Sequence, residues 1–107
     1  MSHPVHDLDD LIHQRIRLGV MALLSRVEAA EFMRIKAELH LTAGNLSRHL
    51  QALSDANLIT ISKDGSGYHR ASEPTWVSLT PQGHKALQKE VTALRSLLDH
   101  LPPDPDQ

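Results

Sequence analysis

The chain has 107 residues, no cysteine, and one residue each of tryptophan, tyrosine and phenylalanine. This length fits one domain with a modest aliphatic core, and the lack of cysteine excludes disulfides and thiolate metal sites. The formal net charge is −2, yet residues 11–98 hold all eleven basic residues and only seven of the thirteen acidic ones. No apolar run is long enough for a membrane span and no export signal is visible, so we expect a cytoplasmic location.

The N-terminal part of the chain predicts two helices. We expect a flexible tail over 1–6, and then a first helix that Asp7 or Asp9 caps and that ends near residues 25–26. A second, shorter helix is expected from about 32 to 39, with room for a brief extended stretch around Ala30 and Glu31. The apolar face of the first helix would contain Leu8, Leu11, Ile12, Ile16, Val20, Leu23 and Leu24.

A third helix is predicted from residue 43 to 55 or 56. Thr42 precedes it as the N-cap, and Asn57 follows it where a left-handed residue ends a helix well. Its leucines recur at the spacing of one helical face, which must pack on other helices. The opposite face is small, polar and weakly basic, which suits the floor of a DNA major groove. The residues expected on that face are Gly44, Asn45, Ser47, Arg48, His49 and Gln51.

The same face has a structural alternative, a polar surface helix in some other all-α domain. Such a helix would gain nothing from exposed Gly44 and Ser47, which lower helix propensity. Gly44 also fits a close approach, either of the second helix or of a phosphate group.

The C-terminal half predicts a hairpin and a fourth helix. Residues 58–63 and 75–79 have strand patterns and are joined by a long loop rich in glycine and serine. Thr80 and Pro81 then open a helix in favourable order, with threonine as cap and proline at the first helical position. Beyond residue 100 we expect a disordered tail of proline and aspartate over 101–107.

The fourth helix contains a seam of apolar residues spaced like a short coiled coil. We expect this seam to pair two copies of the chain, although it can also pack against the first helix of its own subunit, and one side can do each. The seam consists of Leu87, Val91, Leu94 and Leu98.

The order helix, helix, helix, hairpin, helix is that of a winged helix-turn-helix protein with one domain over 7–100. Three groups of residues add to this order: Ile12, His13, Arg17 and Leu18; Leu41, Thr42, Gly44, Asn45, Leu46, Ser47, His49, Leu50 and Leu53; and Thr75, Leu79, Thr80 and Gly83. In these residues the chain resembles the small stand-alone winged-helix transcriptional regulators of the MarR/ArsR-like group. The resemblance implies a mainly α (α+β) fold with a three-helix core, a two-stranded β-wing and a C-terminal dimerisation helix.

The resemblance also implies sequence-specific binding of double-stranded DNA by a homodimer that regulates, and more specifically represses, transcription. The implied DNA-binding residues are Thr42, Ala43, Gly44, Asn45, Ser47, Arg48, His49, Gln51, Lys63, His69 and Arg70. Two features depart from the family. The loop before the second strand has few basic residues, and Asn57 stands where a glycine is usual.

Other functions remain open to different degrees. A winged helix that binds a protein partner instead of DNA is the main alternative, since the net charge is near neutral and the wing is thinly basic. We expect no enzyme, because no nucleophile has an adjacent base and no glycine-rich phosphate loop follows a strand. The eight histidines include no i, i+4 pair, so we expect no metal site and no cofactor. A small-molecule effector, or a response to pH through His49 and His69, stays open.

Overall fold

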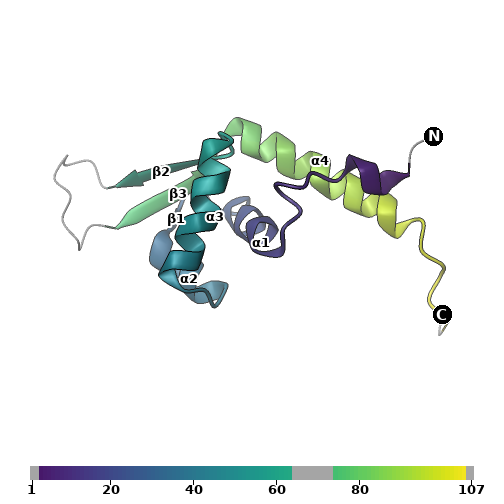
Figure 1. Cartoon of the computed structure of the whole chain (residues 1–107), viewed down its shortest axis with the longest axis horizontal. Coiled ribbons are helices and arrows are strands. Elements are labelled where there is room, and N and C mark those ends of the chain that lie inside the picture. The colour runs from purple at the N-terminus through teal and green to yellow at the C-terminus, as the bar shows by residue number, and fades with distance from the viewer. Residues whose placement is uncertain (1–2, 64–73, 106–107) are drawn as a thin grey trace.

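The computed structural model describes residues 3–63 and 74–105. Figure 1 shows a body of helices from which a β-hairpin extends to one side and a long helix to the other. The described elements are η1 (Pro4–Asp7), α1 (Arg15–Leu24), β1 (Ala30–Glu31), α2 (Phe32–Glu38), α3 (Ala43–Asp55), β2 (Ile59–Lys63), β3 (Thr75–Leu79) and α4 (Pro81–Leu98). The expected order of helices and hairpin is confirmed.

The sheet has three antiparallel strands in the order β1-β3-β2, where the sequence predicted a two-stranded hairpin. The third strand is the brief extended stretch before α2, where Ala30 pairs with Val77 and Glu31 with Trp76. A two-residue strand has too little alternation to be assigned from sequence, because its pairing depends on a partner far along the chain.

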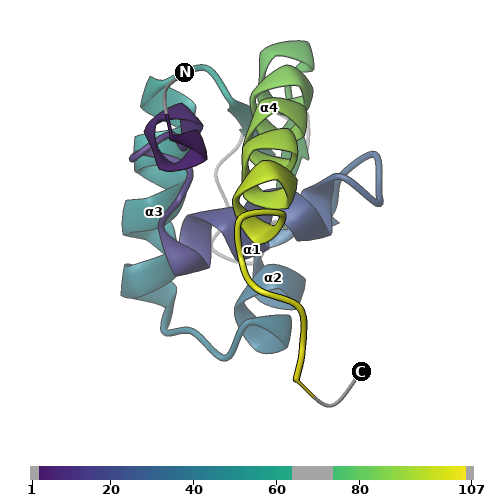
Figure 2. The same ribbon diagram turned by 90° about the vertical axis from the view of Figure 1, so that its right-hand side faces the viewer.

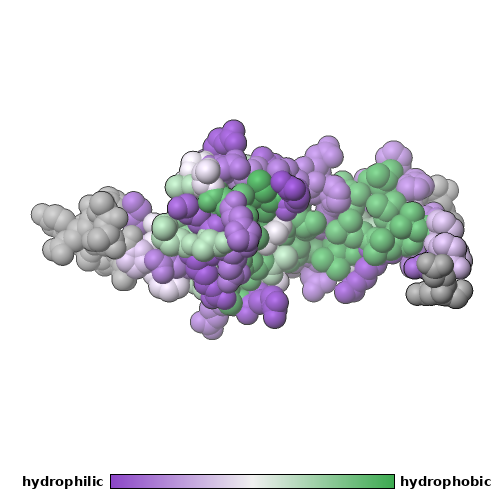
Figure 3. All heavy atoms as spheres, turned by 90° about the horizontal axis from the view of Figure 1, so that it is seen from below, coloured by the Kyte–Doolittle hydropathy of each residue, from purple (hydrophilic) through white to green (hydrophobic). Residues whose placement is uncertain are grey.

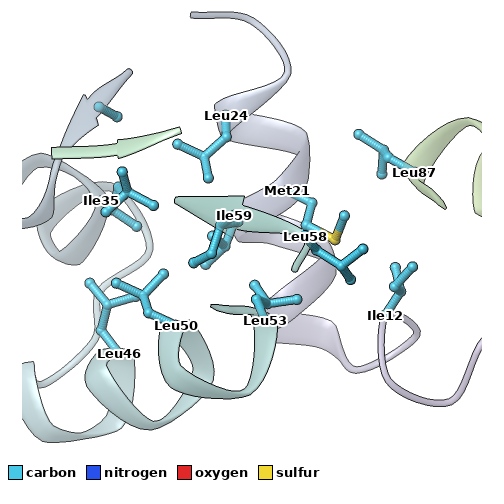
Figure 4. Close-up of a cluster of buried hydrophobic side chains, with 13 residues drawn as sticks. Ile12, Met21, Leu24, Ile35, Leu46, Leu50, Leu53, Leu58, Ile59 and Leu87 are labelled. Atoms are coloured by element: carbon cyan, nitrogen blue, oxygen red, sulfur yellow. The ribbon is translucent and has the colours of Figure 1, made fainter. Parts of the chain in front are cut away.

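The core is aliphatic and lies between α1, α3 and the inner face of the sheet. Figure 4 shows side chains from these elements pointing toward one another, with Leu87 of α4 reaching in from the side. Leu46, Leu50 and Leu53 are all buried, so the apolar stripe predicted for α3 faces this core as expected. Burying each such leucine contributes roughly 1.5–3 kcal/mol, which fixes the rotation of α3 about its axis.

Local signals set both ends of α3. The Thr42 hydroxyl accepts a hydrogen bond from the Asn45 amide at 3.1 Å, which satisfies one free donor of the first turn. After the helix, Asn57 adopts a left-handed conformation with φ of 62°. Both predictions are therefore confirmed.

The N-terminal segment differs from the prediction. Residues 4–7 form the short helix η1 along α4 (Figure 2) instead of a free tail. Helix α1 begins only at Arg15, because the Gln14 side chain caps it by accepting hydrogen bonds from the Ile16 and Arg17 amides at 2.9 and 3.0 Å. Neither Asp7 nor Asp9 is its N-cap. Residues 8–14 are irregular, with a turn at residues 10–12.

Helix α4 starts in a tight corner against the end of α3. The Thr80 amide donates to the Leu58 carbonyl at 3.1 Å, and the Thr80 hydroxyl donates to the Asn57 carbonyl at 2.7 Å. Gly83 faces the same corner, where a β-carbon would collide with the Leu58 carbonyl oxygen. Only glycine permits this close approach, so the first turn of α4 is locked to the loop between α3 and β2.

The apolar seam of α4 divides between two environments. Leu87 is buried in the core of its own subunit, which corrects its assignment to a dimer surface. Val91 also packs partly against this core. Leu98, by contrast, is 62% exposed and Leu101 is 61% exposed. Although α4 is long, no helix within residues 3–63 and 74–105 is both long and apolar enough to cross a bilayer.

Candidate nucleic-acid interface

One side of α3 is exposed on the surface of the protein. We call this side the recognition face; it consists of the exposed residues Thr42, Ala43, Gly44, Ser47, Arg48 and Gln51 and the partly exposed Asn45. Because the leucines of α3 hold the opposite side in the core, this face projects outward on a rigid helix.

Gly44 lies at the open end of the recognition face. A β-carbon built on it would meet no atom within 4 Å, so no element of the described chain approaches it. This excludes the explanation that α2 needs the glycine for packing. The amides of Ala43 and Gly44 are in the first helical turn, where N–H groups have no acceptor within the helix and attract anions. An external group can therefore come close to the backbone here.

The polar side chains of this face are paired along the helix. Arg48 donates to the Asn45 side-chain oxygen at 2.7 Å, and the Gln51 amide donates to the Asp55 carboxylate at 2.8 Å. These contacts hold the guanidinium group and both amide groups extended along the exposed surface. Arginine, asparagine and glutamine are the side chains that make bidentate hydrogen bonds with guanine and adenine edges.

A hollow of about 320 Å³ continues the recognition face toward the hairpin. Ser47 and Gln51 line it from α3, and Lys63 and Thr75 line it from the strands. The structure thus brings Lys63 near two of the predicted residues of α3. The other two predicted residues of the wing, His69 and Arg70, lie outside the described residues.

His49 is not on the recognition face, contrary to the prediction. It is only 9% exposed, and its Nδ1 atom accepts a hydrogen bond of 3.2 Å from Nε of Arg17 in α1. Burial, together with the charges of Arg17 and Arg48, holds the pKa of His49 below its usual 6.5. The imidazole is therefore neutral at pH 7. This agrees with the hydrogen bond, because Nδ1 can accept from a guanidinium group only when it holds no proton.

Two further residues, to which the sequence analysis gave no part in this interface, are Arg17 and Glu90. Glu90 of α4 is 1% exposed and accepts a hydrogen bond from the Asp9 amide at 2.9 Å, while its second oxygen lies 3.2 Å from Nδ1 of His13. The position of Glu90 in the sequence could have indicated that it is buried. Glu90 comes three residues after Leu87, on the apolar side of α4, where a carboxylate needs a buried partner.

The described residues contain no arrangement suited to a metal. Within 3–63 and 74–105, no three or more side chains of His, Cys, Asp or Glu lie close enough together to hold an ion.

Comparison with known proteins agrees with this geometry. A family model described as a winged helix DNA-binding domain matches residues 16–98. The chain belongs to the winged-helix DNA-binding domain family. The matched residues include α1, the sheet, α3 and α4, so this winged-helix domain occupies most of the chain.

The winged-helix domain is similar to proteins from archaea and bacteria. It is 28% identical over 82 residues to the uncharacterised protein MJ0432 of Methanocaldococcus jannaschii, which covers 77% of this chain and 86% of that protein. It superposes on a transcriptional regulator homologue from Pyrococcus horikoshii OT3 with a TM-score of 0.81 and 25% identity, covering 92% and 96% of the two chains.

A third similar structure is more distant in sequence. BpsR of Bordetella bronchiseptica, whose DNA binding is regulated by 6-hydroxynicotinic acid, matches with a TM-score of 0.70 and 17% identity over 94% of this chain and 79% of that one. At this identity the likeness concerns the fold.

Proposed function

We propose that the protein is a homodimer that binds double-stranded DNA at specific sequences and represses transcription from the bound site. The observation that carries this proposal is the recognition face: a rigid helix with open surroundings at Gly44, on which Arg48 is bonded to Asn45 and Gln51 to Asp55. Membership of a DNA-binding family supports it, as does the likeness to a transcriptional regulator homologue.

In this proposal the residues of α3 divide into two roles. Thr42, Ala43, Gly44 and Ser47 contact phosphates near the start of the helix, where backbone amides attract them. Asn45, Arg48 and Gln51 read base edges. From the wing, Lys63, His69 and Arg70 follow the DNA backbone. His49 takes no direct part, because it is buried.

The dimer is proposed from the surface of α4. Figure 3 shows apolar surface along the part of the molecule that α4 forms. Here Leu98 and Leu101 are largely exposed, and Leu94 and Leu97 are only partly covered. A small domain rarely leaves such a stretch in water, and one recognition helix reads too few base pairs to select a site. A second copy on α4 would solve both problems and would place two recognition faces on one DNA site.

The test is a selection of bound duplexes from a random DNA library at low salt, followed by affinity measurements on the selected duplex. The parent protein should enrich a palindrome, and its affinity should fall as salt is added, because phosphate contacts release counterions. Arg48→Ala should weaken binding to the selected duplex by about tenfold, the cost of one base contact. Circular dichroism should show that its fold is unchanged.

Arg34→Ala is the matched control. Arg34 of α2 is also exposed and also bonded to a side chain one turn away, Glu38 at 3.0 Å, but it lines a different surface beside the end of α1. Arg34→Ala should therefore bind the selected duplex as tightly as the parent protein does.

If no sequence is enriched and salt has no effect on affinity, the proposal is wrong. A protein that co-purifies and is lost on Arg48→Ala would then favour a protein-binding module.

A further inference from the structure

A continuous set of polar contacts runs from α4 to α3 through the N-terminal segment. Glu90 of α4 accepts from the Asp9 amide at 2.9 Å, and the Asp9 carboxylate accepts from the Leu11 amide at 2.8 Å. The Leu11 carbonyl accepts from Arg17 at 3.2 Å, and Arg17 donates through Nε to His49 at 3.2 Å. We call these five residues the polar bridge.

The polar bridge is buried at its two ends. Its two end groups are almost inaccessible to water, with 1% exposure for Glu90 and 9% for His49. Between them, Ile12 is 1% exposed and fixes the turn segment in the core. A buried carboxylate or imidazole that lost its partner would carry a large desolvation cost, so the contacts of Glu90 and His49 favour this one arrangement, whereas the contact between Asp9 and Leu11 is exposed.

The bridge joins the two elements whose relative placement matters most for the proposed function. Helix α4 carries the surface for the second copy, and α3 carries the recognition face. In a two-fold dimer, the angle between these helices sets the separation of the two faces, which must match the half-site spacing on DNA. The corner at Gly83 joins the start of α4 to the end of α3, and the polar bridge adds a second connection farther along α4.

We propose that Arg17 and Glu90 are positioning residues that set the half-site spacing the dimer accepts, by tying the recognition helix to the dimer helix through the polar bridge. This inference rests on the proposed function. It assigns a role in DNA selection to two side chains that touch no DNA.

The test uses the palindromic duplex selected by the parent protein, together with versions that have one base pair inserted or removed between the half-sites. The parent should bind both altered duplexes about tenfold more weakly, because one base pair shifts and rotates one half-site. Arg17→Met should reduce this preference to less than about threefold, whereas Arg15→Met should keep it. Arg15 is an exposed residue of the same helix, so both variants lose one positive charge.

Glu90 is tested by two variants of similar size. Glu90→Leu removes both acceptors and should abolish the spacing preference. Glu90→Gln keeps an oxygen for the Asp9 amide and a nitrogen that can donate to His13, so it should restore the preference. A general loss of stability would weaken binding to all three duplexes alike, which leaves their ratio unchanged. If Glu90→Leu does not fold, Arg17→Met still tests the inference through the ratio of its affinities for the selected and the altered duplexes.

The outcomes separate this inference from the proposed function. If the parent selects no palindrome, the proposed function fails and the inference falls with it. If the parent shows a spacing preference that Arg17→Met retains in full, the dimer reads DNA but the polar bridge does not set its geometry.

Discussion

Replacing Gly44 with alanine should stabilise the protein and weaken its binding to DNA. No atom lies within 4 Å of where the new methyl group would stand, so the substitution meets no steric resistance. An alanine has fewer unfolded conformations to lose, and the expected gain in the free energy of unfolding is about 0.4–1 kcal/mol. For a domain of this size, that gain raises Tm by roughly 2–6 °C.

The opposite effect on DNA follows from the same empty space. If the DNA backbone approaches the first turn of α3, a methyl group at residue 44 holds it away from the amides there. Losing one hydrogen bond to a charged phosphate costs about 1.5–3 kcal/mol, so affinity for the selected duplex should fall by at least about tenfold.

Gly19→Ala is the control for both measurements. Gly19 lies inside α1, and a β-carbon there would make an ordinary contact of 3.6 Å with Leu39. It should raise Tm and leave affinity unchanged. Thermal unfolding and fluorescence anisotropy with the selected duplex measure the two quantities. If Gly44→Ala binds as tightly as Gly19→Ala, the first turn of α3 does not meet the DNA backbone.

Three further predictions concern other parts of the fold. Leu98→Glu should convert the dimer to a monomer in sedimentation equilibrium, while Met33→Glu, at a residue 56% exposed on α2, should not; a dimeric Leu98→Glu would exclude α4 as the interface. Gly83→Ala should lower the free energy of unfolding in urea by about 1–3 kcal/mol, since its methyl group collides with the Leu58 carbonyl, and an unchanged midpoint would contradict that corner. Because the pKa of His49 is lower in the folded protein than in the unfolded chain, the fold has its full stability above about pH 6.5. Part of that stability is lost as the pH falls through the pKa of the folded protein. His49→Gln should therefore lose less stability than the parent between pH 7.5 and 5.5 in urea unfolding, and equal losses would count against a neutral buried imidazole.

Local chemistry allowed much of the fold to be predicted from sequence. Thr42 as N-cap, Asn57 in a left-handed conformation and Pro81 in the first turn of α4 each depend on the residue itself and its near neighbours. The recognition face followed from the leucine spacing, because that spacing fixes which side of α3 is free.

The errors arose where a distant partner decides the outcome. His49 lies at the helical spacing of Leu46 and Leu53 and so belongs to the buried stripe, but its polarity favoured the exposed face. The Arg17 side chain that makes its burial acceptable is 32 residues away. The start of α1 was predicted too early for a similar reason, because Asp9 bonds through its amide to Glu90, 81 residues away, and no local pattern reports this contact.

The tight corner at Gly83 has a consequence for how α4 can move. Glu90 follows Gly83 by seven residues, so these two polar attachments of α4 to the body lie about 10 Å apart along its axis. A helix attached to the body at two separate positions cannot rotate about one of them alone. Any ligand or partner that swings α4 must either break the contacts of Glu90 or open the corner, so a change in its angle is expected as a switch between two states and not as a gradual bend.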